Sequence, residues 1–145
     1  ALDILLPLAG EVRLEVVAGS GAASLPRLRD LAARNAIDLH VDVRDMATLS
    51  AQADVAVGAG GGSVWERAVL GLPSIVVPLA DNQIAMTTLL DSYGALVSAE
   101  LADLGRAWTR LIGDAELRRS LAERSASLCD GLGAQRVAEA LLAAS

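Results

Sequence analysis

Aromatic residues and cysteine are scarce in this chain. Of its 145 residues, 53% are hydrophobic, yet only Trp65, Trp108 and Tyr93 are aromatic. The core must therefore be built from Leu, Val, Ile and Ala, and a chain of this length suits one domain spanning 1–145. Cys129 is the only cysteine. It excludes an internal disulfide and a zinc site built on several thiolates, and it suits a reducing, cytoplasmic location.

Positive charge is also in deficit. The chain has 12 Lys and Arg against 18 Asp and Glu, a formal net charge of -6. Nucleic-acid binding needs a basic patch, so no nucleic-acid partner is expected. A bound phosphate would have to be held by local geometry, such as glycine-rich backbone and helix N-termini. The apolar run 74–80 is too short to cross a bilayer, so no transmembrane segment is expected.

Apolar periodicity and glycine punctuation predict strands that alternate with helices. The predicted strands are 14–18, 38–43, 54–58, 74–79 and 94–98, and the rest of the chain after them is predicted to be helical. This order is typical of the α/β class, with a parallel sheet and helices on both faces. Ligands of such sheets bind at the carboxyl ends of the strands, where both glycine-rich loops of this chain fall.

The strongest local signal is the glycine-rich segment 58–66, which joins the third predicted strand to a helix. Its glycines would let phosphate groups approach backbone N–H groups, and a helix N-terminus adds a favourable partial charge. Ser63 could donate its hydroxyl to phosphate, and the Glu66 carboxylate could accept hydrogen bonds from ribose hydroxyls. The alternative is a tight turn in which Ser63 and Glu66 form a capping box. The segment by itself favours neither interpretation.

A second glycine-rich loop, 19–24, follows the first predicted strand. It resembles the dinucleotide-binding fingerprint with the third glycine replaced, and Asp42 stands near the end of the next strand, where such folds hold a ribose. A dinucleotide-binding module is therefore an open alternative. Short Gly-x-Gly matches are weak, however, and an ordinary turn between strand and helix is favoured.

Two further polar clusters have more than one interpretation. Asp38, His40 and Asp42 alternate along a strand, so a metal site is conceivable, but a solvated strand face is favoured because the intervening residues are apolar. Asp81 or Asn82 would suit the N-cap of the helix that follows the fourth strand. Alternatively, the polar segment 81–83 would bind sugar hydroxyls at the ligand edge. We expect no metal and no cofactor.

Four segments in this order, 45–47, 53–67, 70–74 and 80–83, resemble one family. It is that of the UDP-sugar hydrolases of the pseudaminic-acid pathway and the spore-coat polysaccharide proteins like them. More distantly, the pattern is similar to the GlcNAc transferase of peptidoglycan synthesis, which has the GT-B fold. The resemblance covers nearly the whole chain, but only the C-terminal half of such enzymes. It implies a Rossmann-like C-terminal half of a GT-B fold.

The resemblance also implies roles for individual residues. The positions that match nucleotide-binding residues are Ser20, Gly21, Val43, Met46, Gly60, Gly61, Gly62, Ser63, Val64 and Glu66. Those on the sugar side are Asp81, Asn82 and Gln83. Glu66 would bind ribose, the glycines with Ser63 the diphosphate, and Val43 with Met46 the uracil ring.

One departure from the family concerns the catalytic machinery. The family's N-terminal domain, which carries a histidine thought to be the catalytic base, has no counterpart here, and His40 lies on a different kind of element. No catalytic residue is therefore assigned. We expect an N-terminal domain as partner and UDP or a UDP-sugar as ligand, bound by a chain that is inactive alone. The activity of the whole enzyme would be hydrolysis, with transfer to a sugar acceptor as the alternative. A non-catalytic interaction domain is a further possibility.

Overall fold

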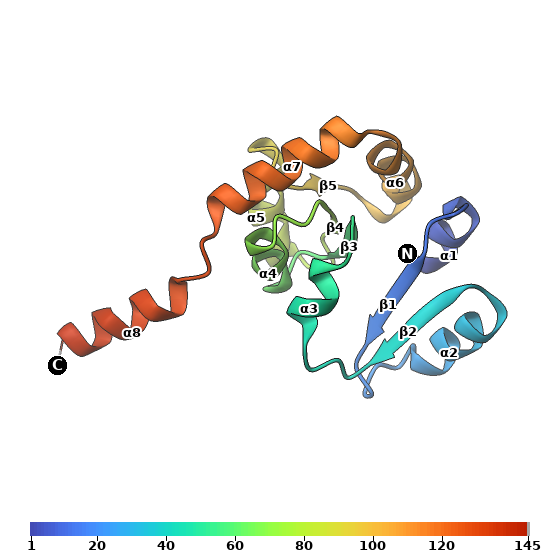
Figure 1. Cartoon of the computed structure of the whole chain (residues 1–145), viewed down its shortest axis with the longest axis horizontal. Coiled ribbons are helices and arrows are strands. Elements are labelled where there is room, and N and C mark those ends of the chain that lie inside the picture. Colours follow the sequence, from blue (N-terminus) through green and yellow to red (C-terminus); the bar gives the residue numbers. More distant parts are fainter. Residues whose placement is uncertain (145) are drawn as a thin grey trace. The chain divides into compact units, whose positions relative to one another are not determined.

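The computed structural model describes residues 1–144, which form two compact units (Figure 1). The N-terminal unit is Leu2–Met46, and the C-terminal unit comprises the described residues from Ala47 onward together with Ala1. The organisation as one domain, 1–145, stays a prediction.

The N-terminal unit has one pair of parallel strands. Its elements are α1 (Leu2–Leu5), the 3-10 helix η1 (Leu6–Leu8), β1 (Leu14–Ala18), α2 (Leu25–Arg34) and β2 (Ile37–Val41). β1 pairs with β2 so that Leu14 lies opposite Ile37, and both side chains are buried. The strand predicted over 38–43 ends earlier because Asp42 adopts a φ of 52°, a left-handed conformation that extended strands do not contain.

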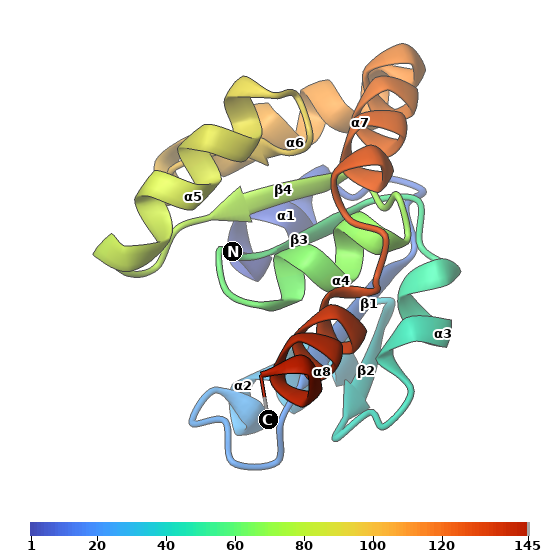
Figure 2. The same ribbon diagram turned by 90° about the vertical axis from the view of Figure 1, so that its left-hand side faces the viewer.

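The C-terminal unit has a parallel sheet of strand order β3-β4-β5, covered by helices (Figure 2). α3 (Met46–Ala51) leads into it from the last residue of the N-terminal unit. Its other elements are β3 (Ala56–Ala59), α4 (Ser63–Val69), β4 (Ser74–Val77), α5 (Asp81–Ser92), β5 (Val97–Ser98), the 3-10 helix η2 (Leu101–Asp103), α6 (Leu104–Gly113), α7 (Ala115–Leu128) and α8 (Gly133–Ala143).

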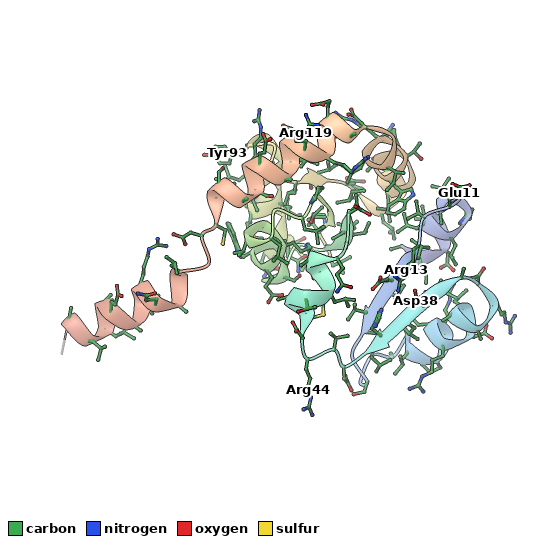
Figure 3. All side chains as sticks on the ribbon, viewed as in Figure 1. Glu11, Arg13, Asp38, Arg44, Tyr93 and Arg119 are labelled. Carbon is green, nitrogen blue, oxygen red and sulfur yellow. The ribbon has the colours of Figure 1, made fainter. Side chains whose placement is uncertain are left out.

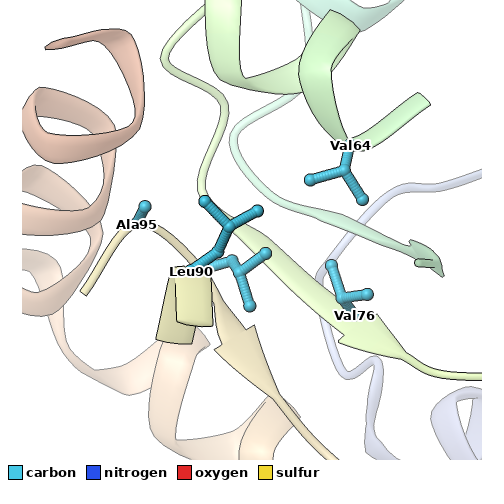
Figure 4. Packing of buried hydrophobic residues seen from close by; sticks show 5 residues of the cluster. Val64, Val76, Leu90 and Ala95 are labelled. Carbon is cyan, nitrogen blue, oxygen red and sulfur yellow. The ribbon is translucent and has the colours of Figure 1, made fainter. Parts of the chain in front are cut away.

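β4 forms the centre of this unit. All four of its residues are buried, as expected of a strand covered on both faces. On one face, Val76 packs with Val64 of α4 and Leu90 of α5 (Figure 4). Since neighbouring residues of a strand point to opposite faces, Ile75 faces the other way, where α6 contacts β4 and buries Leu104. Each such side chain contributes roughly 1.5–3 kcal/mol of hydrophobic stabilisation. The predicted α/β class, with parallel strands flanked by helices, is confirmed.

α8 differs from the other helices of this unit. The helical spacing predicted from Val137, Leu141 and Leu142 is confirmed, but all residues of α8 are exposed, with Leu142 at 78%. Its apolar side chains therefore add little to the core of the described chain. Within residues 1–144, every helix is too short or too polar to cross a membrane.

Candidate nucleotide-binding site

The loop between β3 and α4 begins with a glycine that is tightly enclosed. Gly60 is buried, and a Cβ built on it would lie 2.8 Å from Thr87 Cγ2 and 3.0 Å from Gln83 Cβ, both on α5. Its N–H donates to Gln83 Oε1 at 3.2 Å. The missing side chain at Gly60 thus allows α5 to approach closely, and its N–H is already used within the protein.

The next two glycines lie in the open. A Cβ at Gly61 or Gly62 would meet no atom within 4 Å. Among residues 1–144, the backbone N–H groups of Gly61, Gly62 and Ser63 donate to no partner. Free amides in sequence are a common means of binding phosphate oxygens. Of the predicted diphosphate loop, the structure therefore leaves Gly61, Gly62 and Ser63 available to a ligand.

Glu66 is also available. The N-cap position of α4 is Gly62, no side chain caps the helix, and the hydroxyl of Ser63 accepts instead from Arg67 Nη1 at 3.1 Å. The capping box between Ser63 and Glu66, which was the structural alternative, does not form. Glu66 is exposed, and within the described part of the chain it makes no hydrogen bond or ion pair. Its carboxylate is therefore free to accept hydrogen bonds from hydroxyl groups. Val64, by contrast, is 4% exposed and packs in the core.

Arg67 belongs to the family motif 53–67, but the sequence indicated no role for it in the site. Its Nη1 donates to Ser63 Oγ, and its Nη2 donates to Ala59 O at 3.3 Å, so the guanidinium joins the end of β3 to the start of α4. Burial lowers the pKa of Arg67 from its ordinary value, and its Nε has no partner in the described chain. The only local signal was its position one helical turn after Ser63.

The sugar-side segment lies beside this loop. The N-cap of α5 is Ala80, so Asp81 and Asn82 are not the caps that the sequence suggested. Both are exposed. Gln83 Oε1 accepts from Leu79 N at 2.9 Å as well as from Gly60 N, which ties the two loops together. The structure thus brings Gly60 and Gln83 into contact, and the sugar-binding roles of Asp81, Asn82 and Gln83 stay predictions.

In the N-terminal unit, Asp42 closes the loop that follows β1. Its Oδ1 accepts from Ser20 N at 2.7 Å. This backbone hydrogen bond, and then the bond from the Ser20 side chain, lower the pKa of Asp42 from its ordinary value. The carboxylate that a dinucleotide would need for its ribose is thus engaged with the protein itself. Gly21 is exposed, Val43 is half-buried and Met46 is 36% exposed. Their roles in nucleotide binding stay predictions, as does that of Ser20.

Ion pairs join side chains on the polar face of β1 and β2. Arg13 Nε donates to Asp38 Oδ2 at 2.7 Å (Figure 3), and His40 Nε2 lies 3.1 Å from Glu15 Oε2. This arrangement is the solvated strand face that the alternation favoured. Within residues 1–144, no group of three His, Cys, Asp or Glu side chains is close enough to hold a metal ion.

A pocket of about 770 Å³ lies at the carboxyl ends of β4 and β5, between α5 and α6. It is lined mainly by apolar side chains such as Leu79, Ile84 and Leu101, with Arg106 and Arg110 among them. None of the predicted site residues lines it. The pocket is therefore a neighbour of the glycine loop and not the same site.

The fold is that of a glycosyltransferase C-terminal domain. Residues 8–101 match the glycosyltransferase family 28 C-terminal domain, and the chain belongs to this family. Over 99 residues it is 34% identical to the spore coat polysaccharide biosynthesis protein SpsG of Bacillus subtilis (strain 168), which covers 64% of this chain and 29% of that protein.

Two solved structures share the fold. MurG of Acinetobacter baumannii superposes with a TM-score of 0.71 at 23% identity, over 89% of this chain and 40% of that one. A putative UDP-N-acetylglucosamine 2-epimerase from Listeria monocytogenes superposes with a TM-score of 0.64 at 16% identity, over 94% of this chain and 46% of that one. The resemblance to spore-coat proteins and the GT-B type of fold are confirmed. The chain spans less than half the length of these relatives.

Proposed function

We propose that this chain binds the UDP part of a UDP-sugar and is the nucleotide-binding half of an enzyme in which water displaces UDP from the sugar. One observation carries the proposal. The free N–H groups of Gly61, Gly62 and Ser63 stand within about one helical turn of Glu66, whose carboxylate makes no hydrogen bond or ion pair in the described chain. A diphosphate next to a ribose offers the complementary groups, oxyanions for the amides and hydroxyls for the carboxylate.

The same groups would assist departure of UDP. When the bond between sugar and phosphate breaks, negative charge grows on the diphosphate oxygens. Amides that already point at these oxygens stabilise the charge without reorganising. Asn82, exposed at the start of α5, would hydrogen-bond the sugar. No step in this scheme calls for a metal or a cofactor.

The whole activity requires more than this chain. A hydrolytic step needs a base within about 3 Å of the reacting water. In the segments 58–67 and 80–83 the ionisable side chains are Glu66, Arg67 and Asp81. His40, the single histidine, lies 3.1 Å from Glu15 in the N-terminal unit. We therefore assign the base to an N-terminal domain, which would also close the cleft against bulk water. The relatives, of which this chain spans less than half, leave room for such a domain. On sequence grounds we place the enzyme in the cytoplasm and in surface-polysaccharide synthesis, in keeping with the name of the SpsG relative.

A second candidate is transfer of the sugar to an acceptor hydroxyl instead of water. The family 28 match and the likeness to the Streptomyces glycosyltransferase SsfS6, with a TM-score of 0.53, favour it. The nucleotide half would work in the same way in both reactions, because in both the group that leaves is UDP.

Calorimetric titration of this chain with UDP, UMP and NAD tests the proposal. We expect UDP to bind more tightly than UMP, because the loop amides need a diphosphate, and NAD to bind poorly, because Asp42 is engaged by Ser20. NAD binding as tight as that of UDP would favour a dinucleotide-binding module. UDP release from UDP-sugars should stay far below the ordinary enzyme rate of about 1 s⁻¹ or more. Turnover at that rate by this chain alone would contradict the assignment of the base to another domain.

A further inference from the structure

Arg67 occupies an unusual place behind the glycine loop. Its guanidinium lies against Gly58, where an added Cβ would be 3.0 Å from Nη1, and it bonds to Ala59 O on one side and Ser63 Oγ on the other. The side chain thus spans the loop from the end of β3 to the first turn of α4. In the chain, the exposed amides of Gly61 and Gly62 lie between these two anchor points.

No carboxylate of residues 1–144 forms an ion pair with Arg67, and both of its hydrogen-bond acceptors are uncharged. Burial lowers the pKa of Arg67, and the charge of Glu66, its neighbour in sequence, raises it by less. Its Nε is buried and has no partner. A partly buried cation without a carboxylate partner is costly, and such a cost is recovered when an anion binds nearby.

We propose that Arg67 is a positioning residue for the diphosphate: it braces the loop 60–63 from behind and lends it positive charge without touching the ligand. This inference rests on the proposed function, since it assumes that the loop binds a diphosphate. Gly58 is included in this inference because a Cβ there would lie 3.0 Å from Arg67 Nη1, so the guanidinium would have to shift.

The test compares three ligands, uridine, UDP and inorganic pyrophosphate, on the same chain. The variants are Arg67→Met, Arg67→Lys and Gly58→Ala, with Arg119→Met on α7 as the control for loss of one surface charge. We expect Arg67→Met to weaken the binding of UDP and of pyrophosphate about tenfold, the scale of one charge interaction near a protein surface. Uridine binding should change by less than about twofold, since uridine carries no charge.

The other variants separate charge from bracing. Lysine keeps the charge but cannot reproduce the planar guanidinium that makes two hydrogen bonds. We therefore expect Arg67→Lys to lower UDP affinity about threefold. Gly58→Ala keeps the charge of Arg67 and displaces its guanidinium. It should therefore weaken UDP binding without changing uridine binding. Arg119→Met should bind all three ligands like the unchanged chain. Should Arg67→Met fail to fold, Arg67→Lys and Gly58→Ala decide the question by the same ratio of UDP to uridine affinity.

Equal loss of UDP and uridine affinity in these variants would overturn the inference, because a residue that only supports the fold affects both ligands alike. Unchanged UDP affinity would overturn it as well. If the chain without substitutions binds pyrophosphate but not UDP, the proposed function is refuted. The inference about Arg67 is then tested by the pyrophosphate affinities of the variants. A chain that binds neither would refute both.

Discussion

The loop after β1 and the loop after β3 both continue a parallel strand with glycines, but their backbone amides meet different partners. In the N-terminal unit, the Ser20 amide donates to the Asp42 carboxylate of the same unit. In the C-terminal unit, only the Gly60 amide is bonded, to Gln83, and the amides of Gly61 to Ser63 are free. A carboxylate at a loop repels anions, whereas free backbone amides attract them.

This contrast shows how weak a glycine motif is as a functional signal. Glycine permits a tight turn, close packing of a helix or approach of a ligand. Gly60 serves packing, whereas Gly61 and Gly62 face open space. The neighbours of each glycine, more than the glycine itself, determine which use applies.

The largest effect should come from the packed glycine. We expect Gly60→Ala to destabilise the C-terminal unit by about 3 kcal/mol, the upper end for overpacking, because the new Cβ collides with Thr87 and Gln83. Urea unfolding followed by tryptophan fluorescence measures it, since both tryptophans, Trp65 and Trp108, belong to this unit. Gly61→Ala is the matched control and should change stability by less than about 0.5 kcal/mol. Equal losses in the two variants would refute the distinction between packed and open glycines.

The next effect concerns affinity. Glu66→Ala should weaken UDP binding by about 2 kcal/mol, the scale of hydrogen bonds to a charged group. Folding should change little, because Glu66 caps no helix and bonds to nothing in the described chain. Calorimetry with UDP and thermal unfolding are compared, with the exposed Glu123 of α7 replaced by Ala as control. A loss of thermal stability with unchanged UDP affinity would assign Glu66 to the fold instead of the ligand.

A smaller effect should follow from loss of the Asp42 carboxylate in the first loop. The hydrogen bond from Ser20 N lowers the pKa of Asp42 below its ordinary 3.8, so the folded state favours the ionised form. The stabilisation is present above pH 3.8 and is lost as the pH falls through the lower folded-state pKa. Asp42→Ala should remove this acid-dependent part together with the acceptor of the Ser20 amide. Hydrogen exchange at the Ser20 amide measures it, and exchange equally fast in both proteins at neutral pH would contradict the closed loop.

The smallest effect is expected outside both loops, at the start of α8. Hydrogen bonds from Arg136 and then from Leu132 N lower the pKa of Asp130 from 3.8 to about 2. The ionised form therefore stabilises this turn above pH 3.8, and the gain disappears as the pH falls toward about 2. Arg136→Met should raise the pKa of Asp130 toward its ordinary value, as measured by an NMR titration of the carboxyl group. An unchanged titration would show that the ion pair does not persist in solution.

The elements of this chain could be predicted from local pattern to within a few residues. β1 has the predicted bounds, and β4 is buried as its continuous apolar run indicated. Two structural alternatives from the sequence do not hold, each where a side chain decides the detail. Ala80, not Asp81 or Asn82, is the N-cap of α5, and the Ser63–Glu66 capping box is absent. In both places the polar side chain lies one position inside the helix, and a sequence pattern does not specify a boundary that closely.

By itself, the sequence determined the α/β class, the two glycine loops after parallel strands and the membership of the family, because periodicity, turn residues and ordered motifs are local properties. Only the tertiary structure decided how the loops are built. Asp42 and Ser20 are 22 positions apart, Gly60 and Gln83 are 23 apart, and no local rule pairs them. The placement of Arg67 behind the loop likewise required Gly58 and the first turn of α4 to fold against it. Such contacts form when distant segments of the chain pack, and they decide which backbone amides stay free for a ligand.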